Sequence, residues 1–160
     1  MTQMSAIPGN AVVGRLTEVA PWEADLIMSM RLWMENADGQ RDVWNSYARC
    51  YGSAEGHAKM QQFETLLTCL CSHARRPLVR HGLGCDCIGS DEAVLQTLVR
   101  EAARGDLAEA SMIASLLVPA SHAEMVAIYA AQVGQAMKEM SRHYKAAKTI
   151  TPATNERVLH

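Results

Sequence analysis

The sequence lacks long apolar runs and has little proline or glycine, with five and ten residues among 160. No stretch approaches the roughly 18 consecutive apolar residues that a membrane-spanning helix needs. The first residues, Met1 to Met4, carry neither the basic nor the apolar segment of a secretory signal. These absences argue against a membrane protein and against a secreted one. We expect a cytoplasmic protein that makes no membrane contact.

The sequence also lacks an excess of charge of either sign. Fifteen lysines and arginines stand against 17 acidic residues, for a formal net charge of −2, which gives no overall argument for binding nucleic acid or a membrane surface. Hydrophobic residues make up 49% of the chain, which excludes intrinsic disorder and allows a buried core. We expect one helical domain over residues 1–160, with a loose N-terminal arm at 1–13 and a frayed C-terminal tail at 149–160.

The residues that are abundant favour helices. Alanine, leucine, methionine, glutamate and glutamine all have good helix propensity, and no long segment alternates apolar and polar residues as strands do. The predicted fold is all-α, a compact bundle of about six helices with one irregular loop that contains cysteine and histidine between helices three and four. Apolar spacing and end signals place the helices at 21–36, 40–51, 54–75, 91–104, 106–117 and 121–147.

Cysteine and histidine concentrate in one segment around the irregular loop. Its six soft ligand residues are Cys69, Cys71, His73, His81, Cys85 and Cys87. Thiolate and imidazole groups are the ligands that zinc prefers, four of them in a tetrahedron. An irregular loop of about a dozen residues is unusual inside a helical domain. A bound zinc ion would give this loop a fixed structure.

Helical geometry narrows the set of zinc ligands. Cys69 and His73 are four residues apart and share a helix face, whereas Cys71 lies about 200° from Cys69 around the axis. Cys85 and Cys87 can meet at one ion only if the glycine-rich loop turns tightly. The preferred metal ligands are therefore His73, His81, Cys85 and Cys87, with Cys69 as the alternate ligand in place of one histidine.

Two acidic residues follow the loop and are expected to support such a site. Asp91 or Glu92 would accept a hydrogen bond from the second ring nitrogen of a ligating histidine. The ion would hold the segment from His73 to Cys87, and its role would be structural or regulatory, in a protein that binds a partner. This hypothesis does not require an enzyme.

A second hypothesis is a thiol-redox or metal-dependent enzyme that uses Cys85 and Cys87. Neighbouring arginines favour the thiolate form of cysteine. An iron–sulfur cluster would need Cys69 and Cys71 as well, and the helix geometry opposes their joint use. A hydrolytic metal site would need an open coordination position and a general base, for which Asp86, Asp91 and Glu92 are candidates. The sequence has no His-Glu-x-x-His motif.

A third hypothesis is nucleic-acid binding through Arg75, Arg76 and Arg80. A few phosphate contacts would be enough for such binding. No recognition-helix motif accompanies these arginines, and a solvated charged surface explains them more simply, so we do not expect a nucleic-acid partner. A protein partner or self-association remains open, because methionine-bearing helices can form adaptable binding surfaces.

Overall fold

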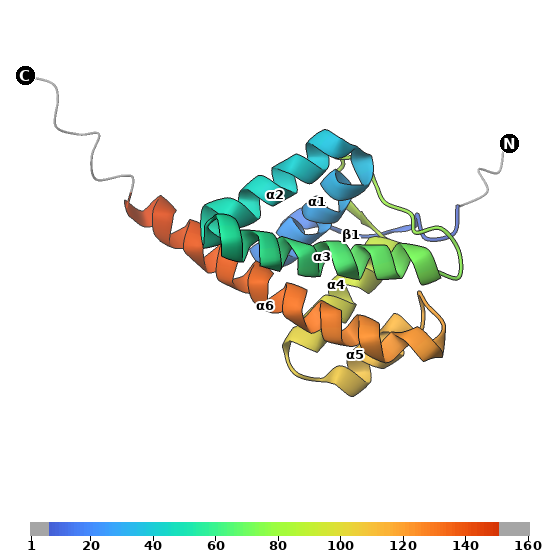
Figure 1. Cartoon of the computed structure of the whole chain (residues 1–160). Helices are drawn as coiled ribbons and strands as arrows, with labels where there is room; N and C mark the ends of the chain where they lie inside the picture. Colours follow the sequence, from blue (N-terminus) through green and yellow to red (C-terminus); the bar gives the residue numbers. More distant parts are fainter. Residues whose placement is uncertain (1–6, 151–160) are drawn as a thin grey trace, which may run out of the picture.

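The computed structural model describes residues 7–150, and in this part of the chain six α-helices form a bundle (Figure 1). The predicted all-α bundle of about six helices is confirmed. The helices are α1 (Pro21–Glu35), α2 (Ala37–Tyr51), α3 (Ser53–His73), α4 (Ser90–Ala103), α5 (Leu107–Ala114) and α6 (Ala120–Ile150). Two short strands, β1 (Val12–Arg15) and β2 (Cys87–Gly89), and one 3-10 helix at Leu16–Glu18 complete these elements.

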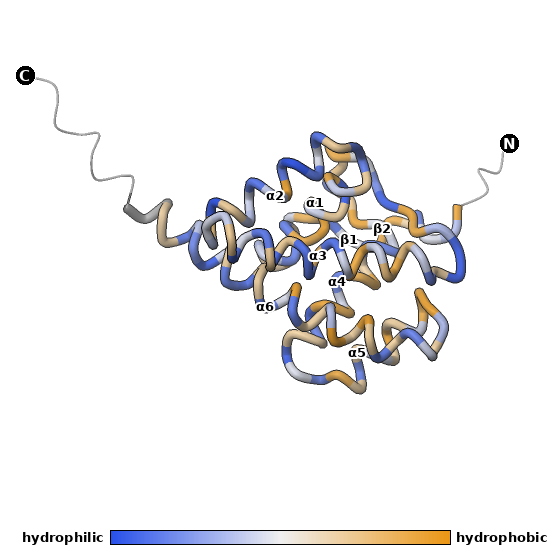
Figure 2. The backbone as a smooth tube through the Cα atoms, in the orientation of Figure 1, coloured by the Kyte–Doolittle hydropathy of each residue, from blue (hydrophilic) through white to orange (hydrophobic). Residues whose placement is uncertain are grey.

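The long helix α6 is the central element of the bundle. It packs against each of the five other helices, most extensively against α3, α4 and α5. Many of its inward residues are small, among them Ala127, Ala130 and Ala136, so neighbouring helices approach closely. Figure 2 shows hydrophilic residues along much of α2 and both hydrophilic and hydrophobic residues along α6.

The predicted helix ends differ from the observed ends mainly between α1 and α2. The sequence places a break at Asp38 and Gly39, whereas the chain turns at Asn36, whose side chain accepts a hydrogen bond from the backbone N–H of Gly39. Gly39 lies inside the first turn of α2, at a position where a Cβ would meet the carbonyl oxygen of Leu32 at 2.0 Å. Glycine therefore permits a close approach of two helices here and does not end one.

The N-terminal arm is more ordered than the sequence indicates. Residues 12–13 of the predicted loose arm belong to β1, which pairs antiparallel with β2 and places Arg15 opposite Cys87. The segment just before α4 therefore has a strand partner from near the start of the sequence. The predicted loose residues 1–6, and the part 151–160 of the predicted frayed tail, lie outside the described residues, and residues 149–150 end α6.

The search for membrane-spanning segments covers the described residues. Within that part of the chain, no helix combines the length and the hydropathy that crossing a bilayer requires.

Candidate thiol and metal site

Arg31, on α1, organises the irregular loop between α3 and β2. Its guanidinium is fully buried and donates to three loop carbonyl oxygens. Nη1 lies 3.1 Å from the oxygen of Gly82 and 2.6 Å from that of Cys85, and Nη2 lies 2.7 Å from that of Cys87. The backbone around both cysteines is therefore held by one side chain of a neighbouring helix.

Glu92, near the start of α4, balances the buried charge of Arg31. Its two carboxylate oxygens accept from Nε at 2.7 Å and from Nη2 at 3.0 Å, so all five N–H donors of the guanidinium have acceptors. The Oε1 atom of Glu92 also accepts from the backbone N–H of Gly89 at 3.0 Å. This network holds the loop from both α1 and α4, so protein contacts as well as a metal ion can fix its conformation.

The ordered loop places the His81 imidazole against the Cys85 thiol. A turn closed by the N–H of Cys85 and the carbonyl of Gly82, at 3.1 Å, brings Cys85 back toward His81. The Nδ1 atom of His81 then lies 3.5 Å from the Sγ atom of Cys85. The other ring nitrogen, Nε2, lies 3.1 Å from the carbonyl oxygen of Asn10. A carbonyl can only accept, so Nε2 carries a proton and Nδ1 is free to accept one from the thiol.

The two cysteines have different acidities in this arrangement. The hydrogen bond with His81 is the main cause that lowers the pKa of the Cys85 thiol, and the backbone N–H of Cys87 lowers this pKa further. Burial raises the pKa of Cys87, and the hydrogen bond and negative charge of Cys85 raise it further. Cys85 is therefore the thiol that ionises first, and Cys87 beside it keeps its proton to higher pH.

A strap formed by residues 7–15 carries the carbonyl that orients His81. The carbonyl of Gly9 accepts from the backbone N–H of Asp91 at 3.0 Å, and the carbonyl of Pro8 accepts from Arg76 at 3.0 Å. Gly9 has φ +90°, and a Cβ there would lie 2.2 Å from Oδ2 of Asp91. Only glycine fits both the backbone conformation and the space.

We expect Gly9→Ala to detach the strap and to destabilise the fold by about 1–3 kcal/mol, because both the positive φ and the Asp91 contact oppose a side chain. Urea unfolding measures the stability, and amide hydrogen exchange of β1 measures the detachment. Gly14→Ala is the matched control, because its added Cβ would have only ordinary contact with Ile88 at 3.8 Å. Unchanged exchange in β1 of the Gly9 variant would contradict this account of the strap.

Of the four preferred ligand residues, the structure places His81 against Cys85, and Cys85 beside Cys87. The imidazole of His73 instead stacks on that of His122, with ring centroids 3.7 Å apart. Cys69 and Cys71 line separate surface hollows on two sides of α3, as their angular separation on the helix predicts. Joint ligation of one iron–sulfur cluster by both of them is not favoured by this geometry.

The expected supporting carboxylates have other partners in the structure. Asp91 accepts two hydrogen bonds from Arg76, both at 2.8 Å, and one from the backbone N–H of Val79 at 2.9 Å. Glu92 binds Arg31 and Gly89, as described above. The second ring nitrogen of His81 is hydrogen-bonded to the backbone carbonyl of Asn10. The sequence pattern does not reveal this partner, because the side chain of Asn10 takes no part in the contact.

The three arginines of the nucleic-acid hypothesis each make a hydrogen bond or an ion pair within the protein. Arg75 donates to the carbonyl oxygens of Ser115 and Val118, Arg76 pairs with Asp91, and Arg80 lies 2.6 Å from a carboxylate oxygen of Glu35. These contacts tie the loop to the bundle.

Neither a search of the described residues for metal-ligand clusters nor comparison with known proteins identifies this site. Among residues 7–150, no three His, Cys, Asp or Glu side chains already surround a common point closely enough to hold an ion. In comparisons with known proteins, no family model, no curated protein and no solved structure matches this chain. The function has therefore to be argued from the contacts of the loop itself.

Proposed function

We propose that Cys85 and Cys87 form a reactive dithiol that carries out thiol–disulfide exchange. The observation that carries the proposal is the 3.5 Å contact between Nδ1 of His81 and Sγ of Cys85, with Nε2 held by the Asn10 carbonyl. A thiol beside a base, with the base oriented by a third group, is the arrangement that activates a cysteine nucleophile. In the cytoplasm, the compartment expected from the sequence, a disulfide of this kind would be transient and catalytic.

The exchange proceeds in two steps that balance. Cys85 gives its proton to His81, and the thiolate attacks one sulfur of a substrate disulfide, whose other sulfur leaves as a thiol after protonation. Cys87 then attacks the Sγ atom of Cys85, which releases the remaining substrate sulfur as a thiol. The substrate disulfide is reduced by two electrons, and the protein ends with a Cys85–Cys87 disulfide.

A zinc ion bound by the same loop is the second candidate function. The observation in its favour is again the separation of 3.5 Å between Nδ1 and Sγ, which equals the ligand–ligand edge of about 3.5 Å in a tetrahedral zinc site. The protonated Nε2 facing a backbone carbonyl is also what metal-binding histidines show. His81, Cys85 and Cys87 would be the ligands, with His73 replaced by a solvent or partner group. Cys87 would have to turn toward the ion.

Elemental analysis and thiol trapping distinguish the two candidates. The dithiol proposal expects metal-free protein that loses two hydrogens in mass when treated with oxidised glutathione. It also expects Cys87→Ser to stop at a mixed disulfide between Cys85 and glutathione, because the second attack is missing. Cys71→Ser is the matched control, since that thiol lies outside the loop, and it should behave as the unaltered chain does.

Other outcomes would decide against the dithiol. One zinc per chain, lost in a Cys85→Ser, Cys87→Ser double variant, with thiols that react only after a chelator is added, supports the zinc candidate instead. Metal-free protein in which Cys85 forms no mixed disulfide in the Cys87→Ser variant would contradict thiol exchange at this site.

Self-association or a protein partner stays a prediction. Its support is at α5 and the turn that follows it, where Met112 and Leu116 keep 68% and 66% of their surface exposed. Single large apolar side chains at this exposure are also common on monomeric proteins.

A further inference from the structure

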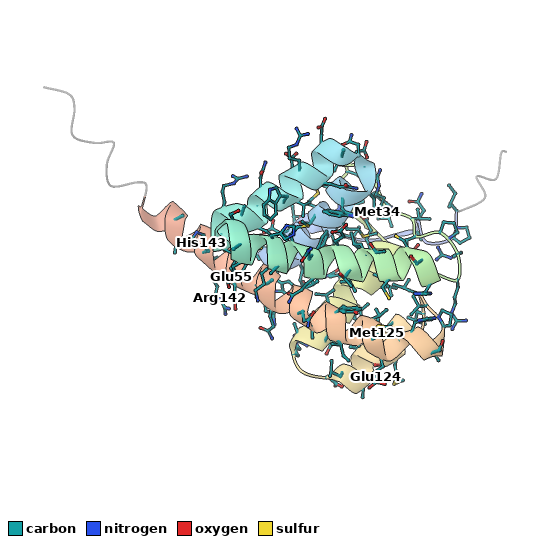
Figure 3. The ribbon with its side chains drawn as sticks, viewed as in Figure 1. Met34, Glu55, Glu124, Met125, Arg142 and His143 are labelled. Atoms are coloured by element: carbon teal, nitrogen blue, oxygen red, sulfur yellow. The ribbon has the colours of Figure 1, made fainter. Side chains whose placement is uncertain are left out.

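The strap of residues 7–15 is joined to the backbone of the cysteine pair itself. The strap and the loop between α3 and β2 lie on the same side of the bundle (Figure 3). Arg15, at the end of the strap, is the strand partner of Cys87. The N–H of the next residue, Leu16, donates to the carbonyl oxygen of Asp86 at 2.8 Å. Asp86 is the single residue between the two loop cysteines, so a change of its backbone acts directly on this attachment.

A second anchor of the strap lies away from the thiols. The carbonyl of Gly9 accepts from the N–H of Asp91 at 3.0 Å, and the carbonyl of Pro8 accepts from Arg76 at 3.0 Å. Arg76 and Asp91 are themselves paired at 2.8 Å. None of these contacts uses a backbone atom of the cysteine pair. The strap therefore has one anchor that thiol chemistry can disturb and one that it leaves in place.

A disulfide between Cys85 and Cys87 does not fit the paired conformation of this segment. Along an extended chain, residues two apart have Cα atoms about 6.4–6.8 Å apart, whereas disulfides most often join Cα atoms about 5.5–6 Å apart. Closing the bond therefore shortens the backbone at Asp86, whose carbonyl oxygen holds Leu16. The sulfur of Cys85 also has to leave Nδ1 of His81, the ring that the strap orients through a backbone carbonyl. Oxidation thus disturbs both contacts between this part of the strap and the loop.

We propose that oxidation of Cys85 and Cys87 releases residues 10–16 from the loop, so that attachment of the strap depends on the redox state of the dithiol. This inference rests on the proposed thiol exchange, because it needs the disulfide that the exchange produces. With oxidised glutathione as the oxidant, the two thiols become the loop disulfide, and the glutathione disulfide becomes two molecules of reduced glutathione. By reciprocity, a change that weakens the attachment of the strap must favour the disulfide.

Amide hydrogen exchange measured by NMR tests the release in the full chain, first reduced and then treated with oxidised glutathione. The N–H of Leu16 should exchange at least about tenfold faster in the disulfide form, because its acceptor on Asp86 moves away. The N–H of Asp91 is the internal control and should keep its rate, since its acceptor, the carbonyl of Gly9, belongs to the other anchor. The tryptic peptide 81–100 contains both loop cysteines and no other cysteine, so its mass shows whether the disulfide has formed.

Leu16→Pro tests the reciprocal effect, because it removes one hydrogen-bond donor. Leu16 is the first residue of a 3-10 helix and follows an extended residue, so a proline fits the local backbone. The ratio of disulfide to dithiol in a glutathione buffer should rise about threefold to tenfold, the effect of one lost hydrogen bond. Leu16→Ala is the matched control. It also removes the leucine side chain but keeps the N–H, so it should leave the ratio unchanged.

Three results would overturn the coupling and leave thiol exchange in place. They are a disulfide in peptide 81–100 with an unchanged exchange rate at Leu16, an equal rise in rate at Asp91, and equal redox ratios for Leu16→Pro and Leu16→Ala. A peptide 81–100 that stays reduced in oxidised glutathione would instead overturn thiol exchange, and release of the strap with it. Circular dichroism checks that Leu16→Pro folds; if it does not, amide exchange in the unaltered chain decides.

Discussion

Replacing Arg31 with methionine is expected to destabilise the protein by about 3–5 kcal/mol, because it leaves a buried Glu92 carboxylate without its partner. Neither side chain of this pair has measurable exposure, and their closest atoms are 2.7 Å apart. The substitution also removes the donors for the carbonyl oxygens of Gly82, Cys85 and Cys87. Urea unfolding monitored by circular dichroism measures the loss of stability.

Arg80→Met is the control for the loss of an arginine near the same loop. Its contact with Glu35 is similarly short at 2.6 Å, but both side chains are partly exposed, so we expect a change below about 1 kcal/mol. Arg31→Met, Glu92→Gln should recover only part of the stability, since the carbonyl oxygens still lack donors. Equal small effects for Arg31→Met and Arg80→Met would show that the loop does not depend on this network.

The sequence predicted the helices well, because their signals are local. Pro21 is the first residue of α1, and Pro77 lies in the loop that follows α3. Apolar residues at helical spacing, such as Leu26 and Met30, lie in the core. The loop was also placed correctly, between α3 and the start of α4. Each of these predictions depends on residues within a few positions of one another.

The contacts that shape the candidate site are distant in the sequence, which is why the same analysis missed them. Arg31 and Glu92 are 61 residues apart, and His81 and Asn10 are 71 apart. One signal for the first pair was present: Arg31 lies four residues after Ile27 on a buried helix face, and a buried cation needs an acid. No sequence signal marks the Asn10 carbonyl as the partner of His81, since every residue has a backbone carbonyl.

The largest expected effect on chemistry comes from replacing His81, because its hydrogen bond is the main cause of the lowered pKa of Cys85. In His81→Phe the ring still packs against Gly89, but Nδ1 is gone. The pKa of Cys85 should rise, so that the midpoint of its pH–rate profile for alkylation by iodoacetamide moves to higher pH. At neutral pH the thiolate fraction, and with it the rate, should fall. Peptide mass spectrometry gives the rate for each cysteine.

The same experiment has a second, opposite prediction at Cys87. In Cys85→Ser the hydrogen bond and negative charge that raise the pKa of Cys87 are lost, while the contribution of burial remains. The alkylation midpoint of Cys87 should therefore move part of the way to lower pH. His57→Phe is the control, because that ring packs on Trp44 with centroids 5.4 Å apart, away from the loop. A Cys85 profile that His81→Phe leaves in place would mean that the imidazole does not hold the thiolate, and the dithiol would lose its activating group.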